Sequence, residues 1–104
     1  MADCGTVAAR RTPRAVTGRA GALEAFRAEG CGPAREWSNG PGDRFGWHDH
    51  PYHKVLFCLA GGIVFHTREG DVGLGPGDRL DLDPGTQHAA TVGPEGVSCI
   101  EAPR

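Results

Sequence analysis

The segment Trp47-His48-Asp49-His50-Pro51 places two imidazoles one residue apart, shortly before an apolar run at residues 55–59. In a β-strand, residues i and i+2 point to the same face, so His48 and His50 would aim at one point. A third histidine, His88, follows a turn-rich segment much later in the chain. Three neutral imidazoles that converge inside a small β-barrel would form a site for a divalent metal ion.

Length and composition indicate one domain rich in turns. The chain has 104 residues, of which 17 are glycine and 8 are proline. This composition is typical of short strands joined by tight turns and is unusual for a helical protein. Aliphatic and aromatic residues cluster in short runs between the turns, which favours a folded β domain over a disordered chain. We therefore expect an all-β sandwich or closed barrel.

The turn residues predict one short helix and eight strands. The helix is expected at residues 21–29, with Thr17 as a possible cap. The strands are expected at residues 34–38, 44–48, 53–60, 63–68, 71–74, 79–82, 87–92 and 97–102, with a tight hairpin at Gly61-Gly62. Residues 1–16 have no period and are read as an arm. The chain then divides into an N-terminal arm and helix at residues 1–33 and a barrel at residues 34–104.

The charge distribution gives no reason to expect a nucleic acid or a membrane as partner. The formal net charge is −2. Residues 1–35 hold six arginines and three acidic residues, which we interpret as a solvated basic arm. No apolar run approaches the roughly 20 residues of a membrane span, and no hydrophobic stretch follows the first arginines as in a secretory signal. We therefore expect a cytoplasmic protein.

The four cysteines are Cys4, Cys31, Cys58 and Cys99, and none of them forms a Cys-x-x-Cys pair. In a reducing compartment they are expected to be free thiols. Cys58 and Cys99 lie in apolar runs and are expected to be small core residues.

A first motif surrounds the histidine pair. Gly42 is followed after five residues by His48-Asp49-His50, after three more by Lys54 and after six more by Gly61. This spacing resembles the first signature of the cupins at every position except Lys54, where the family has glutamate.

A second motif contains the third histidine. Gly77 is followed after five residues by Asp83-Pro84-Gly85 and after two more by His88. This resembles the second cupin signature, although its first proline is replaced by Asp83 and its closing asparagine by Val92. The two motifs stand in the family's order, and the resemblance covers residues 34–102.

The resemblance implies a small double-stranded β-helix barrel with a divalent metal site. Carried over residue by residue, it implies His48, His50 and His88 as ligands. Histidine ligands alone permit Zn, Fe, Ni, Cu or Mn, so the sequence does not choose the metal. Without the family's glutamate, three neutral ligands would leave the full +2 charge on the ion, which would polarise a bound water or substrate more strongly.

Lys54 allows three interpretations, because an ammonium beside a cation repels it and has no lone pair to donate. The side chain could turn toward an acid such as Asp49 or Asp83 and leave a three-histidine site. It could lose its proton through burial beside the metal. Alternatively, the barrel binds no metal, and Lys54 holds an anionic ligand.

For the remaining candidate residues, a structural role is the favoured interpretation over a role in the site. Tyr52 could reach the barrel mouth and hydrogen-bond a substrate, or could pack. His53 has the wrong parity and should point away from the site, and His66 should point outward. Cys58 shares the parity of the histidine pair and could line the lumen, but a core position is favoured. Aromatic residues that could wall the pocket or simply pack are Trp37, Phe45 and Trp47, and the acids expected at a solvated rim are Asp71, Asp78, Asp81 and Asp83.

The sequence thus favours a metal-dependent enzyme that acts on a small, anionic molecule. Dioxygenase, isomerase and lyase chemistry all fit the implied fold, with Lys54 or Tyr52 orienting the substrate or transferring a proton. The alternative is a non-catalytic module that binds a sugar or carboxylate, with Lys54 as the anion partner. A storage or stress-type domain without a ligand is a third reading. A homodimer is expected, because a barrel this small leaves sheet edges to cover.

Overall fold

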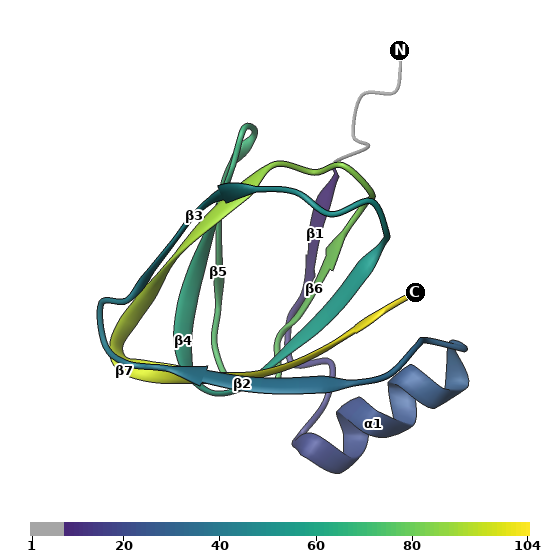
Figure 1. The fold of residues 1–104 in the computed structure, drawn as a ribbon. Helices are drawn as coiled ribbons and strands as arrows, with labels where there is room; N and C mark the ends of the chain where they lie inside the picture. Colours follow the sequence, from purple (N-terminus) through teal and green to yellow (C-terminus); the bar gives the residue numbers. More distant parts are fainter. Residues whose placement is uncertain (1–7) are drawn as a thin grey trace.

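Two long strands, β4 (Lys54–Thr67) and β7 (His88–Pro103), lie side by side in the computed structural model, which describes residues 8–104. They pair antiparallel along nearly their whole lengths, and the register shifts near the middle of the pair. Each strand bends there, so that the pair turns a corner of one continuous sheet (Figure 1). These two strands therefore form the frame on which the shorter strands assemble.

The shorter strands complete the sheet on both sides of this pair. The first half of β4 pairs with β6 (Arg79–Leu82), which in turn pairs with β1 (Ala9–Thr12), whereas the second half pairs with β5 (Gly70–Leu74). The other edge of β7 carries β3 (Arg44–His48) beside its first half and β2 (Arg35–Asn39) beside its second half. The described residues thus form seven strands that wrap into a barrel. The predicted all-β, double-stranded β-helix barrel with a short N-terminal helix is confirmed.

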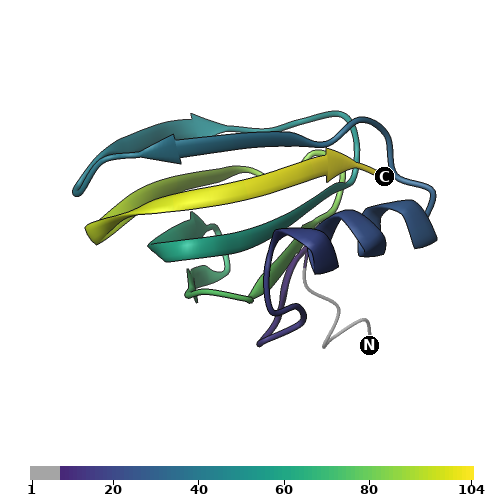
Figure 2. The same cartoon turned by 90° about the horizontal axis from the view of Figure 1, so that it is seen from below.

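Apolar side chains fill the inside of the barrel and also its outer face under the helix. The interior cluster includes Leu56, Cys58, Ile63, Phe65, Leu80, Val92, Val97 and Cys99. Helix α1 (Arg19–Ala28) covers the outer face of the sheet over β4 and β7 (Figure 2). There Phe26 packs edge-on against Phe57, with ring centroids 5.3 Å apart. Because successive side chains of a strand face opposite sides, β4 contributes to both clusters.

The bend of β4 depends on Gly61. Its φ is +72°, and a Cβ at this position would lie 2.0 Å from the carbonyl oxygen of Gly96. Only glycine fits such a close approach of two backbones in this conformation. The hairpin predicted at Gly61-Gly62 is therefore wrong, because β4 continues through it. The turn expected at residues 93–96 is likewise a bend within β7.

The expected N-terminal arm contains a strand. Residues of β1 pair with β6 of the same chain, so this part of the arm belongs to the barrel. The helix begins two residues earlier than predicted, and Thr17 does not cap it, since Gly18 occupies the cap position without a side-chain bond. Cys4 and the start of the arm lie outside the described residues. Within the described range, no helix is both long and apolar enough to cross a bilayer.

Candidate metal centre and pocket

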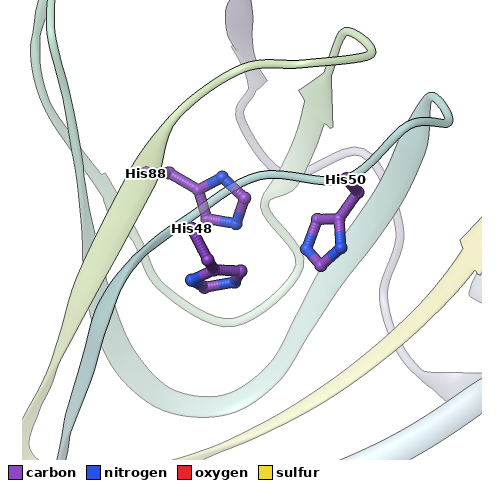
Figure 3. Close-up of side chains that lie close together, drawn as sticks. All are labelled: His48, His50 and His88. Atoms are coloured by element: carbon purple, nitrogen blue, oxygen red, sulfur yellow. The ribbon is translucent and has the colours of Figure 1, made fainter.

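The three predicted histidines lie together at one end of the barrel (Figure 3). His48 ends β3 and is directly opposite His88, the first residue of β7, in the β3–β7 register. His50 lies two residues beyond the end of β3. One ring nitrogen from each of the three residues lies within 4.8 Å of the others. Two segments far apart in the sequence thus bring their imidazoles to one point.

Backbone carbonyls fix the orientation of two of the rings. Nδ1 of His48 donates to the carbonyl of Gly46 at 2.7 Å, and Nδ1 of His88 donates to the carbonyl of Thr86 at 2.8 Å. A carbonyl only accepts, so the neutral rings carry their proton on Nδ1 and leave the lone pair of Nε2 available. Such bonds to the far nitrogen are the usual support of a metal-binding histidine.

His50 presents a buried nitrogen that has no partner. Its Nε2 is the one buried side-chain nitrogen or oxygen without a hydrogen bond in the described chain. Burial, assisted by the positive charge of Lys54, lowers the pKa of His50 to about 4. Burial also lowers the pKa of His88, which is 2% exposed. Both rings are therefore neutral near pH 7, as ligation requires, and an unsatisfied buried nitrogen calls for a partner. The residues present fit a bound cation.

A pocket of about 230 Å³ opens beside the three histidines. Its apolar wall consists of Trp37, Phe45, Leu56, Phe65 and Ala90. Trp37 and Phe45 pack edge to face, with centroids 5.5 Å apart. Tyr52 also lines the pocket, and its ring lies 5.2 Å from that of His50. This volume is below the roughly 300–1,000 Å³ of sites for drug-sized ligands, so the pocket suits a small molecule.

Lys54 lines the same pocket but is already paired. Its Nζ lies 3.1 Å from Oε2 of Glu101, a residue of β7 that the sequence reading did not single out. The other carboxylate oxygen of Glu101 accepts a hydrogen bond from Nε1 of Trp37 at 2.8 Å. Lys54 is 8% exposed. It therefore turns toward an acid, as one of the three interpretations held, but the acid is Glu101 and not Asp49 or Asp83.

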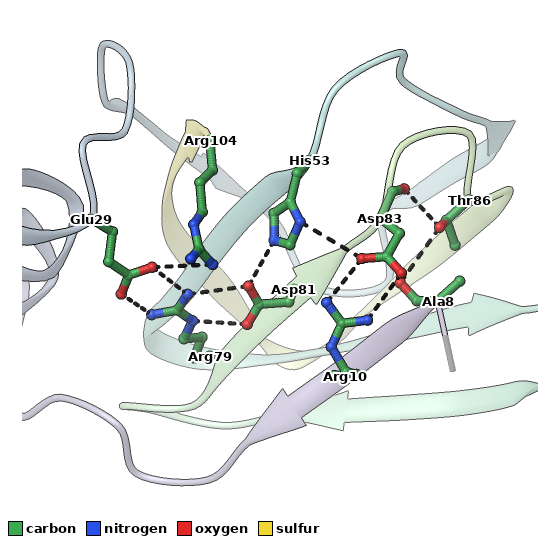
Figure 4. A network of polar contacts seen from close by, with 9 residues as sticks. All are labelled: Ala8, Arg10, Glu29, His53, Arg79, Asp81, Asp83, Thr86 and Arg104. Atoms are coloured by element: carbon green, nitrogen blue, oxygen red, sulfur yellow. Dashed lines mark hydrogen bonds and ion pairs between the residues drawn. The ribbon is translucent and has the colours of Figure 1, made fainter. Parts of the chain in front are cut away.

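His53 points away from the pocket, as its parity predicts. Its Nε2 donates to Asp81 at 2.8 Å, and Asp81 also accepts from Arg79, which binds Glu29 of the helix through two further hydrogen bonds (Figure 4). Asp83 at the other end of this network accepts two hydrogen bonds from Arg10. The network ties β1 and the C-cap of the helix to β6, and none of its residues lines the pocket.

The predicted solvated rim of acids is wrong for two of its four members. Asp81 is 8% exposed and Asp78 is 6% exposed. Asp78 accepts hydrogen bonds from the backbone N–H groups of Arg14 and Gly75, each at 2.9 Å, and so fastens the N-terminal segment to the turn before β6. These carboxylates are structural because they bind cations and backbone donors inside the fold.

The other candidates do not enter the site. His66 lies between Asp71 and Thr91 and bonds to both. Trp47 is exposed, with the guanidinium of Arg68 3.9 Å from its ring centroid. Cys58 is a free, fully buried thiol in the core and does not line the pocket.

Comparison with known proteins places this geometry in a family. The model of the cupin domain matches residues 36–101. The chain belongs to the cupin family. Arg35 and the described N-terminal strand and helix precede the matched range. No curated protein matches this cupin.

Solved structures share the fold. A protein with a double-stranded β-helix domain from Klebsiella pneumoniae is 25% identical, with a TM-score of 0.60, over 67% of this chain and 60% of that one. A cupin domain from Bordetella pertussis is 26% identical, with a TM-score of 0.56, over 67% and 77% of the two chains. The DMSP lyase DddQ from Ruegeria pomeroyi is 26% identical, with a TM-score of 0.64, over 68% of this cupin and only 36% of that chain. This cupin therefore corresponds to about a third of the lyase.

Proposed function

We propose that this cupin holds one divalent metal ion between His48, His50 and His88 and acts as an enzyme on a small anionic molecule. The observation that carries the proposal is the buried, unpartnered Nε2 of His50 beside two rings whose Nδ1 atoms are already engaged. A divalent ion in such a site supplies a Lewis acid, and it lowers the pKa of a bound water. A site of three histidines accepts Zn, Fe, Ni, Cu or Mn.

The residues of the pocket would supply binding and proton transfer. Tyr52 presents its ring beside His50, where its hydroxyl is a candidate to hydrogen-bond a substrate or to exchange a proton with it. The apolar wall excludes water from the bound molecule. Lys54 and Glu101 together are electrically neutral, so Lys54 is a poorer anion partner than an unpaired lysine would be. Their hydrogen bond offers a second place where a proton can be held.

Some of the similar solved structures are enzymes, which favours enzymatic activity over a purely binding role. The DMSP lyase DddQ and a second DMSP lyase structure, 28% identical to this chain, share its fold. DMSP is therefore a reasonable first compound to assay. Turnover that disappears in His88→Ala supports the enzyme. A non-catalytic module remains the second candidate, supported by the small pocket alone, and would bind a carboxylate without converting it.

Metal analysis of protein produced without a histidine tag tests the centre. We expect about one equivalent of divalent metal per chain in the wild type, because the three histidines form a single site. His88→Ala should lose nearly all of it. His66→Ala is the matched control, since it removes an imidazole that lies outside the pocket. Equal metal content in His88→Ala and wild type, or a wild type that takes up no metal on reloading, contradicts the proposal.

The remaining expectations concern partners and location. A homodimer stays a prediction and is supported by β2, which is the last strand of the sheet path and pairs only with β7 among the described strands. A cytoplasmic location, and the absence of a nucleic acid or membrane partner, likewise stay predictions from charge and composition. Sedimentation velocity at two concentrations decides the oligomeric state.

A further inference from the structure

The charges that line the pocket do not cancel. Its charged side chains are Arg35, Lys54 and Glu101. Glu101 is engaged on both oxygens, by Lys54 and by the indole of Trp37. Within the described part of the chain, no hydrogen bond or ion pair engages the guanidinium of Arg35, although Arg35 lies directly opposite Glu101 in the β2–β7 register. One positive charge therefore remains for a ligand.

The strand places Arg35 on the pocket side. Side chains two residues apart share a face, and Arg35, Trp37 and Asn39 all line the pocket. The intervening residues face outward: Glu36 pairs with Arg19 of the helix at 2.7 Å. Arg35 is exposed, lines the pocket and lies opposite Glu101 in the β2–β7 register, next to the Lys54–Glu101 pair in the sheet.

We propose that Arg35 is the residue that selects the substrate, by binding the carboxylate of a short organic acid whose apolar body lies against Trp37 and Phe45. A guanidinium presents paired N–H donors that match a carboxylate. A monoanion matches the single uncompensated charge among the side chains of the pocket, and a hydrocarbon body matches the aromatic wall. The proposal depends on the proposed function only in taking this pocket as the substrate site. It transfers the role of anion partner from Lys54, which the sequence indicated, to Arg35.

The chain provides a reporter inside the pocket and a reference outside it. It has two tryptophans, and the Trp37 indole lines the pocket, whereas Trp47 is 47% exposed and lies outside the lining. The two indole N–H resonances of ¹⁵N-labelled protein, assigned with Trp47→Phe, can be followed during titration. Chelator-treated, metal-free protein is used, so that binding at Arg35 is measured without the metal centre.

Butyrate is the probe, and butyramide and methyl phosphate are its controls at constant ionic strength. We expect butyrate to shift the Trp37 resonance saturably, with a Kd on the order of millimolar, and to leave that of Trp47 unchanged. Butyramide should bind more weakly, because it lacks the charge. Arg35→Gln should weaken butyrate binding about tenfold or more, and Arg35→Lys should weaken it less. Arg44→Gln is the matched control, because Arg44 is an exposed arginine that does not line the pocket.

The outcomes separate this inference from the metal proposal. Butyrate binding that depends on Arg35, in a protein that proves to hold no metal, supports the inference and overturns only the metal centre. Full metal content with no saturable butyrate shift, or equal butyrate affinity in Arg35→Gln and wild type, overturns the inference and leaves the centre standing. Tighter binding of methyl phosphate than of butyrate overturns the choice of a carboxylate. Equal binding of butyramide overturns recognition by charge.

Discussion

Nζ of Lys54 lies 3.1 Å from Oε2 of Glu101, and both side chains line the pocket that contains the three histidines. A carboxylate from β7 compensates the charge of this lysine inside the pocket. The pair is largely buried, with 10% and 13% of the two side chains exposed. The contribution of each residue to the stability of the fold is therefore expected to depend on the presence of the other.

Removal of one member should cost more stability than removal of both. In Lys54→Met, Glu101 keeps its charge and loses its cation, so we expect a loss of about 3 kcal/mol in the free energy of unfolding. The double variant with Glu101→Gln should recover most of this loss. Urea denaturation of the metal-free proteins measures both. A double variant as unstable as the single variant would show that the two residues are not coupled.

Lys54→Glu should tighten metal binding. A carboxylate would replace the ammonium whose charge contributes to the low pKa values of His50 and His88. We expect divalent ions to bind at least about tenfold more tightly, because the carboxylate attracts the ion whereas the ammonium repels it. Lys54→Gln is the control, since it removes the repulsion without adding a ligand. Competition with a chromogenic chelator gives the affinities, and a Glu variant that binds no better than the Gln variant argues that position 54 does not face the ion.

Metal addition should stabilise the wild-type protein. An ion that binds only the folded state adds about 2.7 kcal/mol at a concentration one hundred times its Kd. Thermal unfolding should therefore shift upward on adding Zn²⁺ or Ni²⁺, return on adding chelator, and respond little in His50→Ala. An equal upward shift in that variant would assign the effect to binding elsewhere.

The acidic network predicts how stability depends on pH. The hydrogen bonds from Arg79 lower the pKa of Glu29, and those from Arg10 lower the pKa of Asp83. Burial raises the pKa of Asp81. The hydrogen bonds and positive charges of Arg79 and His53 outweigh this effect, so the pKa of Asp81 is also lowered. The unfolded chain then binds more protons than the folded one as pH falls below the ordinary values of 3.8 and 4.5. This stability is complete above those values and is lost as pH falls through the lowered ones.

The slope of the melting temperature against pH tests the role of this network. The melting temperature of the wild type should fall as pH drops below the ordinary values of 4.5 and 3.8 and should continue to fall through the lowered pKa values. Arg79→Gln should be less stable at pH 7 and should show a flatter slope. Arg19→Gln, which breaks an exposed ion pair with Glu36, is the control and should keep the wild-type slope. An unchanged slope in Arg79→Gln would exclude this network as the origin of acid sensitivity.

Gly61→Ala should strongly destabilise the barrel. Its Cβ would meet the backbone of Gly96 at 2.0 Å, and its φ is positive, so we expect a loss of more than about 3 kcal/mol. Gly73→Ala is the control, because nothing lies within 4 Å of a Cβ in that strand position. Its effect should stay within about 0.5 kcal/mol. Similar urea midpoints for the two variants would show that the corner of the barrel is able to relax.

The sequence predicted the histidine pair from a local rule, because alternation of side chains along a strand places His48 and His50 toward one face. The same parity correctly predicted that His53 points away. The barrel and the third histidine, His88, could not be predicted from such a rule, and they followed from the resemblance of the two motifs to the cupin signatures.

The missed features depend on contacts between distant segments. Gly61-Gly62 has the composition of a hairpin, and only the approach of Gly96 shows that the strand bends instead of reversing. Asp81 was predicted at a solvated rim because its burial depends on Arg79. The guanidinium of Arg79 binds both Asp81 and Glu29, and Glu29 lies at the end of the helix, far away in the sequence. Glu101 lies in the last strand, and no local pattern links it to Lys54.

His48 and His88 are partners across β3 and β7, and His88 comes late in the chain. A nascent polypeptide on the ribosome carries only two of the three imidazoles until the start of β7 has been made, and a fragment that stops before it never acquires the third. An ion bound by all three rings could therefore be captured only after the start of β7 has been made, and it could not guide the collapse of the segments that precede it.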